Sequence, residues 1–299
     1  MNALVMTDIL PTDRVPDTGT PPQGRRSFTP DAARPPDRLY IYYLHGRVQP
    51  ELFADADCLG IWEEGEVSFV FFSGPALERV QARVEDRPEL CLVDHYQMSY
   101  TEWQGGQLSR FCIGPLTVRP VWEHDGVEPG QIQILLDPGV VFGSGLHPTT
   151  RDCLRALTRL SPEQNGGTVL DIGTGSGVLA IAAARLGWDR VLACDLNPLA
   201  VQTAVRNVCF NQVQDRVLPL VGQADHCPCQ TMDLIVANIH FDVMRLLMDL
   251  PVFSACRAFI LSGLLPSQMA VITEMLKERS RTIQGRFSED GTWQTCLGF

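Results

Sequence analysis

The segment from Thr168 to Ala184 constrains the fold more than any other part of the chain. It reads Thr-Val-Leu-Asp-Ile-Gly-Thr-Gly-Ser-Gly and then continues as Val-Leu-Ala-Ile-Ala-Ala-Ala. An apolar strand that enters a glycine-rich turn and then a helix of strong helix formers is typical of doubly wound α/β sheets. Glycines let the backbone approach a ligand closely, and the helix N-terminus presents free N–H groups. The segment therefore predicts a binding site beyond the carboxyl end of a buried strand.

The spacing of this turn distinguishes between cofactors. Nicotinamide dinucleotides are bound by Gly-x-Gly-x-x-Gly, whereas this turn is Asp171-x-Gly173-x-Gly175-x-Gly177. A carboxylate here would repel a pyrophosphate, but it tolerates a sulfonium cofactor with an amino-acid tail. The turn resembles the first motif of class I S-adenosylmethionine-dependent methyltransferases, which favours that class over a dehydrogenase. Asp171, Gly173 and Gly175 are accordingly predicted to bind the cofactor.

Two later strands are predicted to end in polar residues at the same edge of the sheet. Asp195 ends the strand 190–195, where a carboxylate accepts hydrogen bonds from the hydroxyls of an adenosine ribose. The alternative is that Asp195 caps the helix that follows, but Asn197 is able to cap that helix unaided. Asn238 ends the strand 233–238 and is predicted to lie beside the transferred methyl group. Its alternative interpretation is an ordinary turn residue.

A glycine-rich loop precedes the turn and is a second candidate for the site. In residues 137–150 three glycines surround the aromatic Phe142, and a helix follows. Loops of this composition beside a binding site are typical of lids, and Phe142 is predicted to contact the cofactor. The alternative is an ordinary loop that ends in a helix cap, with Thr149 and Asp152 forming a capping box.

The remaining pattern predicts the organisation of the chain. Residues 1–37 are rich in proline without apolar periodicity, and are predicted to be a disordered tail. Residues 38–97 show the order β-α-β-β-α-β of a small α+β, ferredoxin-like domain, with its helices at 50–56 and 75–84. Residues 98–135 are interpreted as a connecting region. In residues 136–299 near-continuous apolar strands alternate with helices, which predicts a doubly wound, mostly parallel sheet covered on both faces.

Composition narrows the functional classes. The formal charge of −11 argues against direct nucleic-acid binding and is compatible with a basic protein partner. No run approaches the roughly 20 apolar residues of a membrane span, and the first residues lack the basic start of a signal peptide. With ten cysteines, these features predict a cytoplasmic protein with reduced thiols. The motif His226-Cys227-Pro228-Cys229 has too few ligands for zinc, so no metal is expected.

Taken together, these motifs resemble those of the PrmA family, the lysine methyltransferases of ribosomal large-subunit protein eleven. The matching segments are residues 139–150, 171–183, 195–213, 236–239 and 259–268, in that order. The resemblance implies a seven-stranded Rossmann-like sheet and S-adenosylmethionine as cofactor, bound through Thr150, Gly173, Asp195 and Asn238. It also implies that the small N-terminal domain recognises the substrate, a basic ribosomal protein methylated on lysine or α-amino nitrogen.

The chain departs from the family pattern at several positions. Ser144 stands where the family has Thr, Thr174 where it has Cys, and His240-Phe241 where it has Leu-Ala. The region around Trp103 lacks the expected basic and second aromatic residues. The last two departures leave open a different protein or small-molecule acceptor, and a homologue that binds the cofactor without catalysis is a third reading. No residue is singled out as a general base, and the lone His240 is read as structural or as orienting the substrate.

Overall fold

The computed structural model describes residues 34–124, 126, 129–160, 166–223 and 231–299. Most of the predicted tail 1–37 and all of the motif 226–229 therefore lie outside the described residues. In the part described, no helix is long and apolar enough to cross a membrane. Within the same residues, no group of three or more His, Cys, Asp or Glu side chains is arranged to hold a metal ion.

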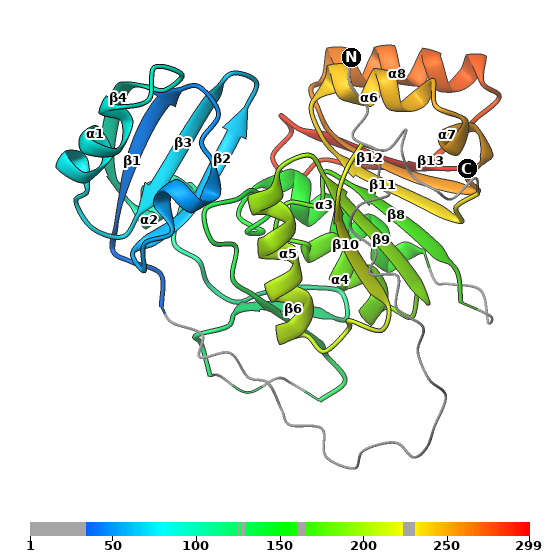
Figure 1. Cartoon of the computed structure of the whole chain (residues 1–299). Coiled ribbons are helices and arrows are strands. Elements are labelled where there is room, and N and C mark those ends of the chain that lie inside the picture. Colours follow the sequence, from blue (N-terminus) through cyan, green and yellow to red (C-terminus); the bar gives the residue numbers. More distant parts are fainter. Residues whose placement is uncertain (1–33, 125, 127–128, 161–165, 224–230) are drawn as a thin grey trace, which may run out of the picture.

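The N-terminal part is a four-stranded antiparallel sheet with the order β2-β3-β1-β4 (Figure 1). Its elements are β1 (Arg38–His45), η1 (Pro50–Phe53), β2 (Cys58–Glu64), β3 (Val67–Phe72), α1 (Leu77–Glu85) and β4 (Cys91–Ser99). This is the strand order and connectivity of the predicted ferredoxin-like unit. The helix predicted at 50–56 is instead a four-residue 3-10 turn. It ends at Phe53, and Asp55 beyond it pairs with Arg79 and Arg83 of α1.

The two faces of this small sheet have different partners. On one face Tyr42, Val70 and Phe72 pack with Val80 of α1. On the other face lie residues that alternate with these, and they belong to a buried cluster shared with the rest of the molecule: Leu39, Ile41, Phe71, Tyr100, Val140, Val141, Leu199 and Ala200. Period-two alternation thus places apolar side chains on both faces. The sheet docks through its second face.

The predicted connecting region carries regular structure. It contains α2 (Tyr100–Gln104), β5 (Phe111–Ile113), β6 (Leu116–Pro120) and β7 (Ile132–Leu136). The three strands form a sheet of their own, and its apolar residues join the core under the C-terminal sheet: Ile113, Leu116, Val118, Ile134 and Leu136. Much of this region is therefore buried against the C-terminal part of the chain.

The C-terminal part is a seven-stranded sheet with the order β10-β9-β8-β11-β12-β14-β13. The strands are β8 (Thr168–Ile172), β9 (Arg190–Asp195), β10 (Val217–Val221), β11 (Leu234–Asn238), β12 (Ala258–Leu264), β13 (Ile283–Phe287) and β14 (Gln294–Gly298). The first five strands in this order run parallel, and β14 runs antiparallel to both of its neighbours. The predicted doubly wound, mostly parallel sheet is confirmed.

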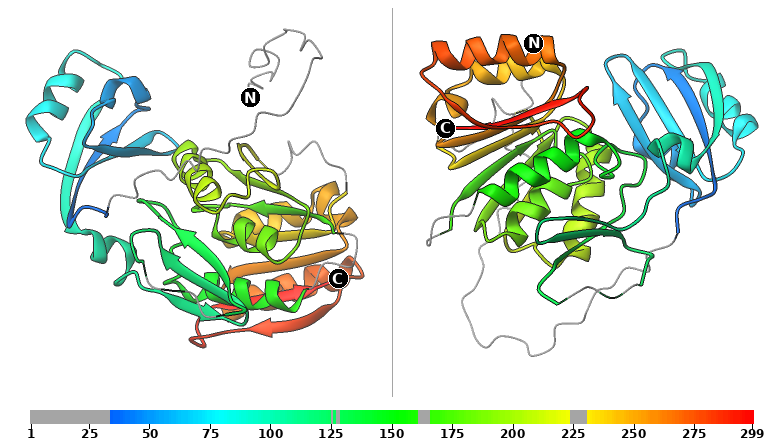
Figure 2. Two further views of the ribbon diagram at one scale, coloured as in Figure 1. Left: turned by 90° about the horizontal axis from the view of Figure 1, so that it is seen from below. Right: turned by 180° about the vertical axis from the view of Figure 1, so that it is seen from behind.

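Helices cover both faces of this sheet (Figure 2). They are α3 (Pro148–Arg159), α4 (Val178–Arg185), α5 (Pro198–Phe210), α6 (Phe241–Met248), α7 (Pro251–Ala255) and α8 (Pro266–Glu278). Residues of α3, α4 and α5 share one core cluster, and those of α6, α7 and α8 share the other. Successive residues of β8 point to opposite faces of the sheet: Val169 belongs to the first cluster and Leu170 to the second. The carboxyl ends of β9, β8 and β11 lie next to one another at one edge.

Two buried asparagines of α5 fix the chain that leads into the glycine-rich loop. The amide of Asn207 donates to the carbonyl oxygens of Asp137 (2.9 Å) and Ser176 (2.8 Å), and its Oδ1 accepts from the Asp137 N–H (2.8 Å). Asn211 bonds the N–H and the carbonyl of Leu135 at 2.9 and 2.7 Å. These bonds hold the end of β7 and the start of the loop against α5.

The Asn207→Ala variant tests this tie. It leaves three buried backbone groups without their partner, and each such group costs about 1–3 kcal/mol. Partial relaxation reduces the sum, so we expect a loss of about 2–4 kcal/mol in the free energy of unfolding, measured by urea denaturation. Val205→Ala, on an exposed position of the same helix, should change it by less than about 0.5 kcal/mol. Equal stability of the two variants would contradict the assignment.

Candidate functional site

The glycine turn after β8 lies directly against the loop that precedes α3. Gly173, Gly175 and Gly177 have φ values of 69°, 54° and 82°, a left-handed region that favours glycine. A Cβ at Gly175 would lie 2.6 Å from the carbonyl oxygen of Phe142, a contact that no side chain could accept. The turn therefore needs glycine for backbone-to-backbone contact with the loop as well as for its own curvature.

Asp171 lies beneath this turn. Its side chain is only 1% exposed and accepts a hydrogen bond from Thr174 Oγ1 at 2.6 Å. Burial raises the pKa of Asp171 to about 7, while the bond from Thr174 opposes the rise. The carboxyl group supports the turn from below, and Thr174 supplies the donor.

Asp195 is the last residue of β9, as predicted from the sequence, and lies beside the turn. Its Oδ2 accepts from the Gly175 N–H at 3.0 Å, and its Oδ1 accepts from the Asn197 N–H at 2.9 Å. Burial raises the pKa of Asp195, although the backbone N–H groups of Asn197 and Gly175 act against it. Asn197 is the cap of α5, accepting from the Leu199 N–H at 2.9 Å. Asp195 is thus not the helix cap, and each carboxylate oxygen keeps a lone pair for a further donor.

The loop before α3 is tied to the glycine turn through Ser176. The Ser176 N–H donates to the carbonyl of Phe142 at 2.9 Å, and the Ser176 hydroxyl donates to the carbonyl of Gly143 at 2.8 Å. These bonds fix the backbone at the aromatic residue and directly after it. The Phe142 side chain itself is 48% exposed. It projects from a fixed backbone.

On its other side the loop is tied to α2. The Tyr100 hydroxyl donates to the carbonyl of Gly139 at 2.6 Å, and Trp103 Nε1 donates to the carbonyl of Val140 at 3.1 Å. Burial raises the pKa of the Tyr100 hydroxyl, which keeps it protonated as a donor. The loop therefore joins the N-terminal part of the molecule to the edge where the turn lies.

The helix after the loop is capped differently from the sequence expectation. Its N-cap is His147, whose Nδ1 accepts from the Thr149 N–H at 3.4 Å. The predicted capping box of Thr149 and Asp152 is wrong, because Pro148 occupies the first helical position and places the cap one residue before it. Asp152 instead accepts from Arg155 Nη1 at 2.8 Å and from the Glu289 N–H at 3.1 Å.

Asn238 brings the end of β11 into contact with the start of α3. Its Nδ2 donates to Thr149 Oγ1 at 3.2 Å, and Thr149 Oγ1 lies 2.7 Å from His147 Nδ1. Thr150 follows on the same helix. Its Oγ1 is buried and has no hydrogen-bond partner among the described residues. A buried hydroxyl without a partner is unusual, and this one belongs to a residue predicted to contact the cofactor.

A cavity of about 440 Å³ opens beside Asn238. Its walls include the rings of Phe142, His147, Phe241 and Trp293. The His147 ring lies 5.4 Å from that of Phe142 and 5.2 Å from that of Trp293, both edge-on. Burial lowers the pKa of His147, so its ring is neutral near pH 7.

His240 also lines this cavity. It departs from the family pattern, and the sequence left open whether it is structural or orients the substrate. It is the N-cap of α6, with Nδ1 accepting from the Asp242 N–H at 3.4 Å. Its side chain is 74% exposed. The capping bond gives the ring a structural role at the mouth of the cavity.

Three contributors to the site were not singled out from the sequence. Ser176 lies inside the glycine motif, where its position between two glycines was the available signal. Trp103 was noted only as part of a departure from the family pattern. Trp293 reaches the cavity from the turn between β13 and β14, and no local pattern marks it.

Comparisons with known proteins cover the larger part of this chain. The model of the family described as ribosomal protein L11 methyltransferase (PrmA) matches residues 76–298. Among curated proteins, the ribosomal protein L11 methyltransferase of Desulforamulus reducens is 39% identical over 184 residues, which are 61% of this chain and 59% of that protein. The protein of the same name from Geobacter metallireducens is 39% identical over 204 residues, 66% of this chain and 65% of that protein. The chain thus matches less than two thirds of the length of either relative.

A solved structure is also similar. The crystal structure of ribosomal protein L11 methylase from Lactobacillus delbrueckii subsp. bulgaricus aligns with a TM-score of 0.55 at 30% identity. The alignment covers 64% of this chain and 98% of that one. Together with the strand order, this likeness shows the Rossmann-like fold of class I methyltransferases.

The Asp171→Asn variant tests the electrostatics beneath the turn. The folded-state pKa of about 7 lies above the ordinary aspartate value of 3.8. Between these two pH values the folded state holds a proton that the unfolded state has lost, so this group's contribution to stability decreases as the pH rises from about 4 to about 7. Asn removes that decrease and keeps the acceptor for Thr174. The Tm of the variant should therefore fall less than the wild-type Tm between about pH 5 and pH 8.

Thermal unfolding monitored by circular dichroism at each pH measures this difference. Asp215→Asn, at an exposed position, is the matched control and should follow the wild type. Parallel profiles for all three proteins would show that Asp171 does not titrate in this range.

Proposed function

Because this chain belongs to the ribosomal protein L11 methyltransferase (PrmA) family, we propose that it transfers methyl groups from S-adenosylmethionine to amino nitrogens of a ribosomal protein. The observation that carries the proposal is the meeting of three predicted residues at one sheet edge. Gly173, Asp195 and Asn238 follow or end the adjacent strands β8, β9 and β11. In open α/β sheets ligands bind at this edge.

The residues at this edge fit the cofactor. Each carboxylate oxygen of Asp195 accepts from one backbone N–H and keeps a lone pair that a ribose hydroxyl can fill. Thr150 Oγ1 is a second buried polar atom in need of a partner among the described residues. Gly173 is exposed at this edge and has no side chain, so a ligand can approach its backbone closely. Asp171 supports the turn from below, and Phe142 flanks it.

When bound, S-adenosylmethionine supplies an electrophilic methyl group on a sulfonium centre. The chain's own task is to present a neutral amine in line with it. The wall of the cavity beside Asn238 is mostly apolar and aromatic, and partial desolvation against it lowers the pKa of an entering ammonium group. Holding the amine at a fixed distance and angle then supplies much of the rate. Asn238, whose Nδ2 is held by Thr149, is the positioning residue for the amine.

His147 is unsuited to act as the general base. Its Nδ1 already accepts from the Thr149 N–H as the helix cap, so the neutral ring carries its proton on Nε2. A ring in that state has no free lone pair to take a proton from the amine. The amine is therefore deprotonated by exchange with solvent as it enters the cavity.

For the acceptor we propose ribosomal protein L11. The family match and the names of the relatives support this choice. The formal charge of −11 also favours a basic partner, because opposite charges raise the rate of encounter. We propose in addition that residues 38–97 form a substrate-recognition domain and residues 136–299 the catalytic domain.

Incubation of purified L11 with the enzyme and labelled S-adenosylmethionine tests the acceptor, with mass spectrometry of the product. Added mass in steps of one methyl group on lysine or the N-terminal amine is the expected result. Binding of the cofactor together with transfer to some other acceptor would reject L11 and leave the reaction class.

The Asp195→Ala variant tests the cofactor site. It removes a charged acceptor for the ribose, a type of bond that contributes roughly 1.5–3 kcal/mol. The affinity for S-adenosylmethionine should fall about tenfold to a hundredfold, measured by isothermal titration calorimetry. Asp195→Asn retains one carbonyl oxygen and should lose less.

Two controls accompany this measurement. Asp215→Ala removes an exposed acid outside the site and should bind as the wild type does. Circular dichroism checks that the Asp195 variants fold, because their backbone partners Gly175 and Asn197 lose an acceptor. Unchanged affinity in a folded Asp195→Ala protein would reject the ribose contact.

A further inference from the structure

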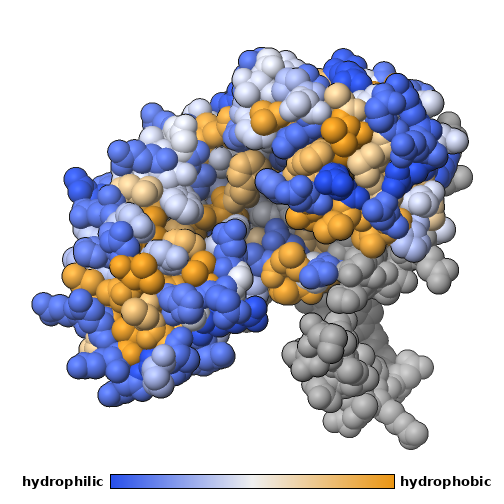
Figure 3. Space-filling view, turned by 90° about the horizontal axis from the view of Figure 1, so that it is seen from above, coloured by the Kyte–Doolittle hydropathy of each residue, from blue (hydrophilic) through white to orange (hydrophobic). Residues whose placement is uncertain are grey.

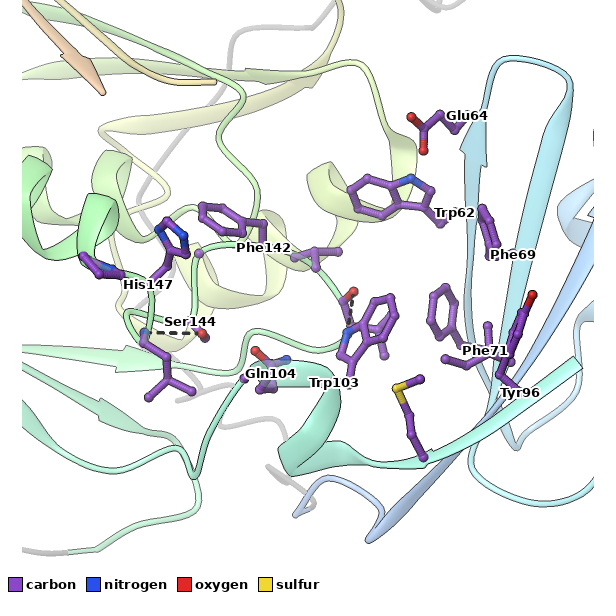
Figure 4. A pocket seen from close by; sticks show the side chains of 18 residues that line it. Trp62, Glu64, Phe69, Phe71, Tyr96, Trp103, Gln104, Phe142, Ser144 and His147 are labelled. Atoms are coloured by element: carbon purple, nitrogen blue, oxygen red, sulfur yellow. Dashed lines mark hydrogen bonds between the residues drawn. The ribbon is translucent and has the colours of Figure 1, made fainter. Parts of the chain in front are cut away.

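A second and larger cavity, of about 760 Å³, lies between the N-terminal sheet and the loop before α3. Six of the residues that line it are Phe, Tyr or Trp: Trp62, Phe69, Phe71, Tyr96, Trp103 and Phe142. In Figure 4 the side chains of Trp62, Phe71 and Trp103 lie around the space between the small sheet and Phe142. The ring of Trp103 lies 5.0 Å from that of Phe71 and crosses it edge-on.

The wall is built from one face of the sheet. Ile41 of β1, Trp62 of β2, Phe71 of β3 and Met98 of β4 all line it, while Tyr42, Val70 and Phe72 belong to the cluster on the other face, with Val80 of α1. Several of its aromatic side chains remain accessible, with exposed fractions of 44% for Tyr96, 37% for Trp103 and 48% for Phe142. Figure 3 shows hydrophobic side chains gathered around the hollow between the two parts of the molecule.

Exposed aromatic surface of this extent in a concave site is typical of binding surfaces. The rings of Tyr96, Trp103 and Phe142 stay partly uncovered, although the opposite face of the sheet packs Tyr42, Val70 and Phe72 in a buried cluster. Burying one large apolar side chain in such a site is favourable by an amount that outweighs most single hydrogen bonds.

The position of this cavity next to the one beside Asn238 indicates that a polypeptide substrate occupies it. Phe142 and His147 line both this cavity and the smaller one beside Asn238. The two spaces are thus separated only by side chains of one loop, which is held by Ser176 on one side and by Trp103 on the other. An extended polypeptide advances about 3.3 Å per residue. A chain that places an amine beside Asn238 therefore has neighbouring residues within reach of the aromatic wall.

One acidic side chain lines the larger cavity. Glu64, at the end of β2, is exposed at the edge of the cavity. Among the residues that line this space, Glu64 carries the carboxylate. The other titratable groups there are Tyr96, whose pKa is raised chiefly by its bond to Asp94, and the neutral ring of His147. The edge therefore attracts a cation.

We propose that this cavity is a specificity subsite of the methyltransferase, which takes a large apolar side chain close in sequence to the methylated amine, with a basic residue beside it at Glu64. The inference rests on the proposed function and adds a sequence requirement to it. The acceptor is selected by its flanking residues as well as by its amine. Trp62 is the specificity-determining residue, since its partly buried side chain lines the cavity from β2 in addition to packing against the cluster that joins the small sheet to the loop.

Kinetics with L11 and labelled S-adenosylmethionine test the subsite in the full-length enzyme. Trp62→Ala should raise the KM for L11 by about tenfold or more and leave kcat within about twofold, since it removes binding and not chemistry. Trp62→Phe, which keeps an aromatic wall, should restore most of the affinity. Tyr96→Ala is a second wall variant, at a position exposed enough to tolerate truncation. Leu218→Ala, an exposed residue of β10 on the far edge of the other sheet, is the control and should behave as the wild type.

A peptide library with a fixed central lysine and varied flanking residues gives the second readout. The wild type should favour Leu, Met or Phe at one flanking position over Ala, and Trp62→Ala should lose that preference. Glu64→Gln should lose the preference for Lys or Arg at another position.

The outcomes separate the two proposals. Methylation of L11 with an unchanged KM in both wall variants overturns the subsite and leaves the proposed function intact. Flank preferences that are identical in the wild type and Trp62→Ala also overturn it. Cofactor binding without transfer to L11 or to any library peptide rejects the protein substrate and the subsite together.

Discussion

The structure depends on the contact between the glycine turn and the loop before α3. Two carbonyls of the loop, those of Phe142 and Gly143, accept from the backbone and the hydroxyl of Ser176. The approach is so close that a Cβ at Gly175 has no room beside the Phe142 carbonyl. Since these are backbone contacts, small displacements on either side move both segments. The ring of Phe142 is thereby held between the cavity beside Asn238 and the cavity under the N-terminal sheet.

Around this contact, hydrophobic burial sets the larger arrangement. The cluster that includes Ile41, Phe71, Val140 and Leu199 joins the small sheet to the loop and to α5. A four-stranded sheet with one helix buries only one of its faces by itself, so its second face needs a partner. That face docks through this cluster, and some of its residues, Ile41 and Phe71 among them, also line the larger cavity. The same apolar alternation thus supplies both the attachment of the N-terminal part and the wall of a binding surface.

Desolvation is the common electrostatic theme at the sheet edge. Burial raises the pKa of Asp171 and of Asp195 and lowers that of His147. Each group takes part in hydrogen bonds that hold it in place, yet the charged form of each loses solvation free energy on burial. A ligand whose hydroxyls donate to Asp195 relieves that penalty. Desolvation also favours the neutral form of an amine, and this is the form that attacks a methyl donor.

The sequence by itself determined the parts of this protein that local patterns encode. Local patterns predicted the strand, turn and helix from Thr168 to Ala184 and the strand ends at Asp195 and Asn238. They also predicted the order of elements in the small N-terminal sheet and revealed the family motifs. Periods of 2 and 3.6 residues and the spacing of glycines are visible within a short stretch of sequence. Tertiary structure alone decided which distant segments meet. Nothing local shows that Asn207 holds Asp137, that the residues around Val118 enter the C-terminal core, or that Trp293 reaches His147. The cap at His147 was missed because several residues nearby can cap a helix, and Pro148 with its packing selects among them. Pairings across long sequence separations arise from packing and hydrogen-bond satisfaction in three dimensions, and these leave no periodic trace in the chain.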